Sequence, residues 1–159
     1  MPETPRGKKA EARAAVRAGL RACTFAELDR PDSPWNRAAE QTAQGDPFCC
    51  RTEWGLSFHE AFHPDRPLHL REGGGSVVLF AEHTYAGVGP VLEPIESLWF
   101  FGCPLLGTHA VELLEAFLDE PETRQAARSV LLSGLLPNSP LLRSIASRFR
   151  SRGEIVRCK

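Results

Sequence analysis

The chain has 159 residues, of which 42% are hydrophobic and 25% charged, and its net charge is −1, which predicts a single globular domain with its own core. No apolar run is long enough to cross a membrane, and the charged first residues are not followed by the apolar segment of a secretory signal, so we expect a cytoplasmic protein. The five cysteines include no CxxC pair, which favours reduced thiols over a disulfide framework or a zinc knuckle.

The first predicted element is basic. Residues 1–21 hold six basic and two acidic residues, residues 143–159 hold six and one, and the middle of the chain has a net charge of −10. Residues 8–22 are rich in alanine and arginine, which predicts a helix. Basic side chains recur along it every four residues: Lys9, Arg13, Arg17 and Arg21. Because no aromatic residues are interleaved with this stripe, we favour a solvated face, or one packed on the acidic middle, over a contact with nucleic acid.

Two further helices are predicted before the first long strands. Ser33 and Pro34 supply an N-cap and a first-turn proline for a short helix over 34–43. Thr52 can cap a helix over 52–62. Aromatic residues share one face of this second helix, which we expect to face the core: Trp54, Phe58 and Phe62.

A β-hairpin follows, and after it a strand of aromatic residues. The runs PLHLRE and SVVLFAEH flank three glycines, as in a hairpin with a glycine turn. A looser stretch then leads to SLWFFG, predicted as a strand over 97–102. Its consecutive aromatic residues would point to both faces of the sheet, so both faces should be covered, by the core or by a further part of the protein: Trp99, Phe100 and Phe101.

The last part of the chain alternates helices and strands. Thr108 begins a helix with apolar residues at helical spacing, 129–135 reads as an apolar strand, 137–153 as a capped helix, and 154–159 as a final short strand. The order predicts an α/β fold with a mixed sheet, antiparallel first and parallel after a crossover.

Four stretches carry a family resemblance: DPFCCRTEW before an aromatic helix, the hairpin, LWFFGCPLLG, and LLSGLLPNSPLLRSIASRF. Together they cover roughly residues 35–158 and resemble the first half of CelD-like and FemAB-like acyltransferases of the GNAT superfamily. The resemblance implies a GNAT-like α/β domain over 31–159, a mixed sheet flanked by helices, after a basic helical extension over 1–30.

The resemblance also has a clear departure. Active GNAT enzymes hold the pyrophosphate of acyl-CoA at a helix N-terminus through a stretch like Q/R-x-x-G-x-G/A, where free amides and the helix dipole converge. This chain has no such stretch, and in two-part relatives the cofactor site lies in the second half. The resemblance therefore implies an N-acyltransferase-related domain that uses acyl-CoA only with a partner half or in a homo-oligomer. A non-catalytic binding or scaffold module is the alternative.

A third alternative is a zinc enzyme, because residues 59–63 read HEAFH. His59 and His63 have the spacing that places two zinc ligands on one helical face, with Glu60 as general base and His69 as a third ligand. Pro64 follows directly, however, so the second histidine would lie in the fraying last turn. No metal ligand is therefore assigned, and the HEAFH residues are the runner-up.

Two residues near the end of the predicted aromatic strand are candidates for catalysis. Cys103 would lie at the strand end and His109 in the first turn of the next helix, where amides and an imidazole can activate a thiolate. The alternative, which we favour, is a buried cysteine that packs as a small apolar residue.

Overall fold

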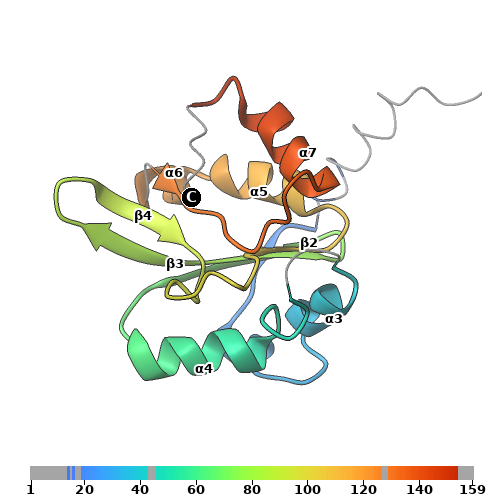
Figure 1. Ribbon diagram of the computed structural model, residues 1–159, viewed down its shortest axis with the longest axis vertical. Helices are drawn as coiled ribbons and strands as arrows, with labels where there is room; N and C mark the ends of the chain where they lie inside the picture. Colours follow the sequence, from blue (N-terminus) through green and yellow to red (C-terminus); the bar gives the residue numbers. More distant parts are fainter. Residues whose placement is uncertain (1–13, 15, 17–18, 43–45, 127–128, 154–159) are drawn as a thin grey trace, which may run out of the picture.

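The computed structural model describes residues 14, 16, 19–42, 46–126 and 129–153, and these build a mixed sheet with helices on both faces (Figure 1). Among the described residues the sheet has six strands in the order β1-β2-β3-β4-β6, with β5 also paired to β3. Their bounds are β1 Arg21–Ala22, β2 Leu68–Gly73, β3 Ser76–Tyr85, β4 Gly89–Glu93, β5 Leu105–Leu106 and β6 Ser129–Val130. The predicted α/β class and mixed sheet are confirmed.

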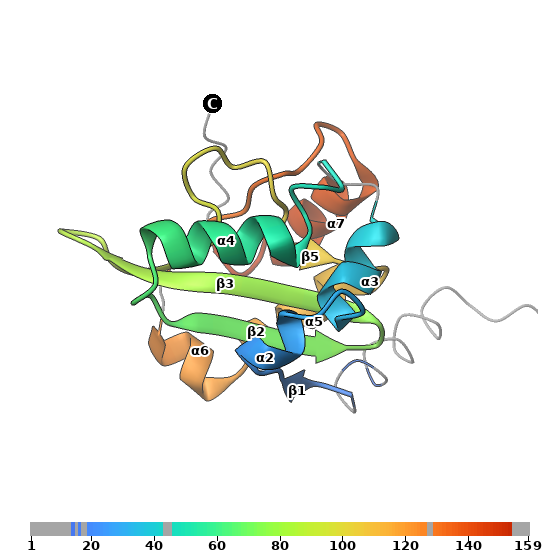
Figure 2. The ribbon, with the colours of Figure 1, turned by 90° about the horizontal axis from the view of Figure 1, so that it is seen from below.

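The helices form two layers, one on each side of the sheet (Figures 1 and 2). The layer below the sheet in Figure 1 contains α3 (Pro34–Glu40) and α4 (Thr52–Phe62), and the short α2 (Phe25–Leu28) precedes them in the chain. The layer above contains α5 (Ala110–Leu118), α6 (Pro121–Ala126) and α7 (Pro140–Phe149). None of the described helices is long and apolar enough to cross a membrane.

The predicted hairpin is confirmed. Strands β2 and β3 pair antiparallel from Leu68 opposite Ala81 to Gly73 opposite Ser76. The turn is made by Gly74 and Gly75, whose φ angles of 58° and 71° favour glycine. This hairpin is the centre of the sheet, because β1 joins one side of β2 while β4 and β5 join the other side of β3.

The predicted strand over 97–102 is wrong. The strand that follows the hairpin is β4, inside the stretch predicted to be loose, and it pairs antiparallel with β3. The chain then leaves the sheet over 94–104 and returns as β5, which pairs with β3 at Val77 and Val78. The segment 97–101 is held instead by a buried carboxylate, and its aromatic residues are exposed rather than covered.

A crossover through α5 brings β6 parallel to β4, as the sequence predicts. The parallel pairing is short: Val91 lies opposite Ser129 and Leu92 opposite Val130, and the Leu131 N–H donates to the Leu92 carbonyl at 2.8 Å. The strand predicted over 129–135 is thus confirmed only at its start.

The remaining predictions fall partly outside the described residues. The helix predicted over 52–62 is confirmed with the same bounds as α4, although Arg51 and not Thr52 is its N-cap residue, and those predicted over 34–43 and 137–153 are confirmed with narrower bounds as α3 and α7. Most of the helix predicted over 8–22 lies outside the described residues, and its last two residues are strand β1 instead. The predicted strand over 154–159 lies wholly outside them.

The core lies between the sheet and both helical layers. On the α5 side, Phe80 of β3 stacks on Phe117 of α5, with ring centroids 5.9 Å apart and planes 5° from parallel. On the α4 side, Leu56 and Trp35 are buried. Val16, before β1, is fully buried as well, so the first described residues belong to the same core.

Candidate functional site

A continuous row of aromatic rings runs along α4 and the neighbouring loop. Phe48 contacts Trp54 (ring centroids 5.7 Å apart), Trp54 contacts Trp99 (5.7 Å), Trp99 contacts Phe58 (5.8 Å), and Phe58 contacts Phe62 (4.9 Å). The rings are tilted or edge-on, the arrangements that aromatic pairs prefer. Two parts of the chain, α4 with its approach and the loop after β4, therefore meet through these rings.

Much of this row faces solvent. Six large apolar residues of the row and the loop are between 41% and 60% exposed: Phe48, Phe62, Leu98, Trp99, Phe100 and Phe101. We call these six residues together with Trp54 and Phe58 the aromatic surface. Monomeric proteins rarely expose large continuous apolar patches, so a patch of this kind marks an interaction site.

The expectation that the aromatic face of α4 points into the core is therefore wrong for most of that face. Phe58 is buried, Trp54 is partly buried, and Phe62 is 56% exposed. The face that packs on the sheet is offset by roughly a third of a turn and carries Leu56 and His59. The aromatic side chains instead bind the loop that follows β4.

That loop is shaped by Glu96. Its carboxylate is buried, with 3% of the residue exposed, and it accepts hydrogen bonds from four successive backbone N–H groups. Leu98 donates at 2.9 Å, Phe100 at 3.1 Å and Phe101 at 2.9 Å, and Trp99 donates as well. Phe100 adopts a φ of 58°, which a side chain other than glycine rarely takes. Such a ring of donors fixes the loop backbone around one anion, so the exposed side chains are held in place.

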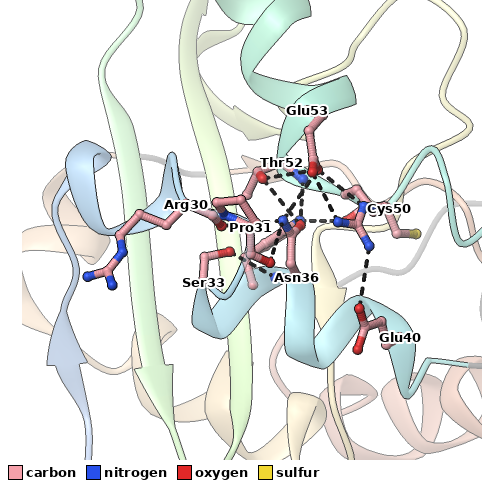
Figure 3. Close-up of polar contacts among 10 residues, drawn as sticks. Arg30, Pro31, Ser33, Asn36, Glu40, Cys50, Thr52 and Glu53 are labelled. Atoms are coloured by element: carbon pink, nitrogen blue, oxygen red, sulfur yellow. Dashed lines mark hydrogen bonds and ion pairs between the residues drawn. The ribbon is translucent and has the colours of Figure 1, made fainter.

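A second buried polar group fixes the start of α4 (Figure 3). Asn36 of α3 is fully buried, and its carbonyl oxygen accepts from the Thr52 N–H at 2.9 Å and from the Thr52 hydroxyl at 3.2 Å. Its amide donates to Glu53 at 3.3 Å, and Glu53 in turn pairs with Arg51 at 3.0 Å. Arg51 also reaches Glu40 of α3 at 3.5 Å. This network joins the N-terminus of α4 to α3, so the helix that carries the aromatic surface is anchored on a rigid neighbour.

A polar cluster lies on the sheet near the other end of α4. Glu93 of β4 is fully buried, pairs with Arg66, and accepts a hydrogen bond from the Tyr85 hydroxyl at 2.7 Å. Arg66 also donates to Ser97 at 3.4 Å, which ties the start of the aromatic loop to the cluster. The hydrogen bond to the Glu93 carboxylate raises the pKa of Tyr85, and the His83 ring lies edge-on to Tyr85 at 4.3 Å. The cluster compensates one buried charge with another, so we interpret it as a support for the loop.

The HEAFH residues do not meet as a metal site. His59 is buried on the face toward the sheet, Glu60 is exposed, and His63 lies beyond the end of α4 as its C-cap. His69 is on β2, with its Nε2 2.8 Å from a carboxylate oxygen of Glu82. No group of three or more His, Cys, Asp or Glu side chains within the described residues could hold a metal ion. The described part of the chain thus gives the zinc alternative no support.

The pair Cys103 and His109 is not assembled either. Cys103 is buried, its thiol donates to the Leu105 carbonyl at 3.3 Å, and burial raises the pKa of the thiol to about 12. At that pKa the thiolate required of a nucleophile does not form at neutral pH. His109 caps α5, and its backbone N–H donates to the Ser76 hydroxyl at 2.8 Å. Cys103 therefore packs as an apolar residue, as we favoured, and the four described cysteines are all free thiols.

Several of the basic residues that the structure describes pair with the protein's own acids. Arg21 pairs with Glu27 at 2.9 Å and with Glu72 at 2.7 Å. Two arginines at the end of the described chain pair with the α5 segment: Arg148 with Glu112 and Glu115, and Arg152 with Asp119. The rest of the basic stripe lies outside the described residues: Lys9, Arg13 and Arg17. These contacts agree with a basic face packed on the acidic middle of the chain.

No protein-family model, curated protein or solved structure matches this chain. The fold and the site define an α/β domain with a fixed, exposed aromatic surface. Sequence reasoning missed the two residues that organise it, Glu93 and Glu96. A signal was present, since both carboxylates interrupt the otherwise apolar run VLEPIES and must find partners if that run is buried.

Proposed function

We propose that the chain is a GNAT-related half-domain of an N-acyltransferase, which lacks an acyl-CoA site of its own and acts with a second, cofactor-binding half. The observation that carries the proposal is the sheet, in which three antiparallel strands are followed by a crossover to a parallel partner. That partner, β6, pairs with β4 over two residues. An antiparallel sheet that continues into a short parallel pair supports the GNAT-like sheet that the resemblance implies.

The helix N-termini support the absence of a cofactor site. An acyl-CoA pyrophosphate needs free amides at the start of a helix. At α5, an added Cβ on Gly107 would lie within 2.7 Å of Gly75 and Ser76, so the β2–β3 turn is packed against this end. At α7, Ser139 accepts from the Leu142 N–H at 3.1 Å.

The start of α4 is likewise engaged, since its Thr52 N–H is bonded to Asn36. The N-termini of the three longest described helices are thus engaged by the chain itself. A second half would have to supply the cofactor.

The non-catalytic binding module is the second candidate, and the aromatic surface is the observation that favours it. The surface is built from buried polar anchors and exposed rings, and the His63 ring lies edge-on to Phe58, with centroids 5.9 Å apart. Both candidates expect binding of another folded surface, and they differ in whether acyl transfer follows.

Acetyl-CoA binding to the purified chain tests the proposal by isothermal titration and native mass spectrometry. We expect no complex with the chain alone. We expect binding, and CoA release when a primary amine is added as acyl acceptor, once the chain is combined with a domain that carries the Q/R-x-x-G-x-G/A stretch. Saturable binding of acetyl-CoA by the chain alone would contradict the proposal. A combined assembly whose transfer rate is the same without this chain would favour the binding module.

A further inference from the structure

We infer that the aromatic surface is a dimerisation surface and that its occupant is a second copy of this chain. The inference does not depend on the acyltransferase proposal, because it uses only the exposed residues, their anchors and their charges. It proposes that two copies of this chain bind each other, a contact that the fold alone does not indicate.

The size of the surface fits a protein partner. A large apolar side chain of this kind carries about 200 Å² of surface, and the six exposed residues are each about half exposed. Together they present on the order of 600 Å², at the upper end of what monomers expose and near the roughly 800 Å² per partner of a standard interface. Two copies joined through this patch would bury on the order of 1,200 Å², where specific interfaces begin.

The chemistry of the surface is complementary to itself. None of its eight residues is charged, so the surface has no field that would select an oppositely charged partner. The carboxylate of Glu96 is buried and bonded to the four backbone amides of the loop. Glu53, beside Trp54, is paired with Arg51 at 3.0 Å. An uncharged apolar patch can face its own copy across a two-fold axis, which is the commonest way in which chains form dimers.

The surface is also fixed before it binds. The loop backbone is held by Glu96, and α4 is held at its start by Asn36. Aromatic side chains have few rotatable bonds, so ordering them on binding costs little. A preorganised patch of exposed Trp and Phe is the composition found at the centres of interfaces.

Sedimentation velocity over a range of protein concentrations tests the inference. We expect the wild-type chain to shift with concentration from its monomer mass of 17.5 kDa to twice that mass, with a dissociation constant in the micromolar range or tighter. Trp99→Ser and Phe62→Ser should each weaken dimerisation at least about tenfold, and the double variant should be monomeric. The matched control is Val88→Ser, because Val88 is 61% exposed but lies in the β3–β4 turn, and its dimer should be unchanged.

A third variant separates a specific surface from general stickiness. Glu96→Ala keeps every aromatic residue but removes the acceptor of the loop amides, so we expect weaker dimerisation with unchanged far-ultraviolet circular dichroism. A wild-type chain that stays monomeric at the highest concentration would overturn the inference. So would a dimer that survives the Trp99→Ser, Phe62→Ser double variant, or a Val88→Ser chain that is weakened equally. Growth into polymers rather than a closed dimer would also contradict it.

Discussion

The two helical layers of the sheet differ in what they do with their large apolar residues. In the α5 layer, Phe117 is fully buried against Phe80, and α7 is tied to α5 by the pairs of Arg148 with Glu112 and Glu115. In the α4 layer, polar groups are buried so that aromatic residues can be exposed. Ion pairs in the α5 layer thus join two helices over a buried core. In the α4 layer, a buried carboxylate holds a loop whose aromatic side chains are exposed. We therefore interpret the α5 layer as the stabilising one and propose the α4 layer for recognition.

The largest expected effect on the free energy of unfolding lies in the α5 layer. Phe117→Ala removes a fully buried ring that stacks on Phe80, so we expect a loss of about 3–5 kcal/mol in the free energy of unfolding. Urea denaturation followed by circular dichroism measures it. A loss below about 1 kcal/mol would mean that this face is not the stabilising one.

The next effect concerns the hydrogen bonds by which Asn36 of α3 holds the start of α4. Asn36→Ala leaves the Thr52 N–H, which donates to Asn36 at 2.9 Å, without its buried acceptor, while the Thr52 hydroxyl keeps Glu53 at 3.3 Å. An unsatisfied buried donor costs about 1–3 kcal/mol, so we expect a loss of that size in the same denaturation assay. Arg37→Ala, an exposed position on the same helix, is the control and should change stability little. Equal losses for the two variants would show that the hydrogen bonds of Asn36 do not account for the loss of stability.

A smaller effect should follow pH. Burial lowers the pKa of His59 on the sheet side of α4, so the folded state resists a proton that the unfolded chain takes up near pH 6.5. The unfolded state then binds more protons, and stability falls as the pH drops below about 6.5 until the folded pKa is passed. Glu27 and Glu53, with pKa values of about 2, stay ionised between pH 7.5 and 5.5.

The urea midpoint at pH 7.5 and 5.5 checks this, with His59→Gln as the comparison. We expect the wild type to lose more stability between the two pH values than the variant does. Identical losses would place the pH dependence elsewhere in the molecule.

The parts of this fold that were predictable from the sequence are those with local, repeated signals. The β2–β3 hairpin has alternating strands and a glycine turn, α7 has a serine cap, and α4 has regularly spaced large apolar residues, so short-range chemistry favours these elements. The loop 97–101 was not predictable in this way. Its sequence has the composition of a strand, but its backbone N–H groups donate to the Glu96 carboxylate instead of to a neighbouring strand.

The orientation of the aromatic face of α4 depends on the same loop. A pattern of Trp54, Phe58 and Phe62 reads the same whether the rings meet a core or another surface element, so periodicity alone cannot choose. The choice is made by Trp99, which lies far along the chain and contacts two of these rings. The candidate site was missed because it consists of such long-range contacts.

The smallest expected effect on stability belongs to the aromatic surface. Phe62 is 56% exposed at the end of α4, so Phe62→Ser should change the free energy of unfolding of the monomer by about 0.5 kcal/mol or less. Denaturation must be measured at a concentration at which the wild type is monomeric, because dimerisation would add its own free energy at higher concentration. If the two layers have the roles argued above, the Phe62 variant keeps its monomer stability and dimerises at least about tenfold more weakly, whereas Phe117→Ala loses stability. A monomeric Phe62→Ser chain destabilised as strongly as Phe117→Ala would show that the aromatic surface is part of the core, and the contrast between the two layers would fail.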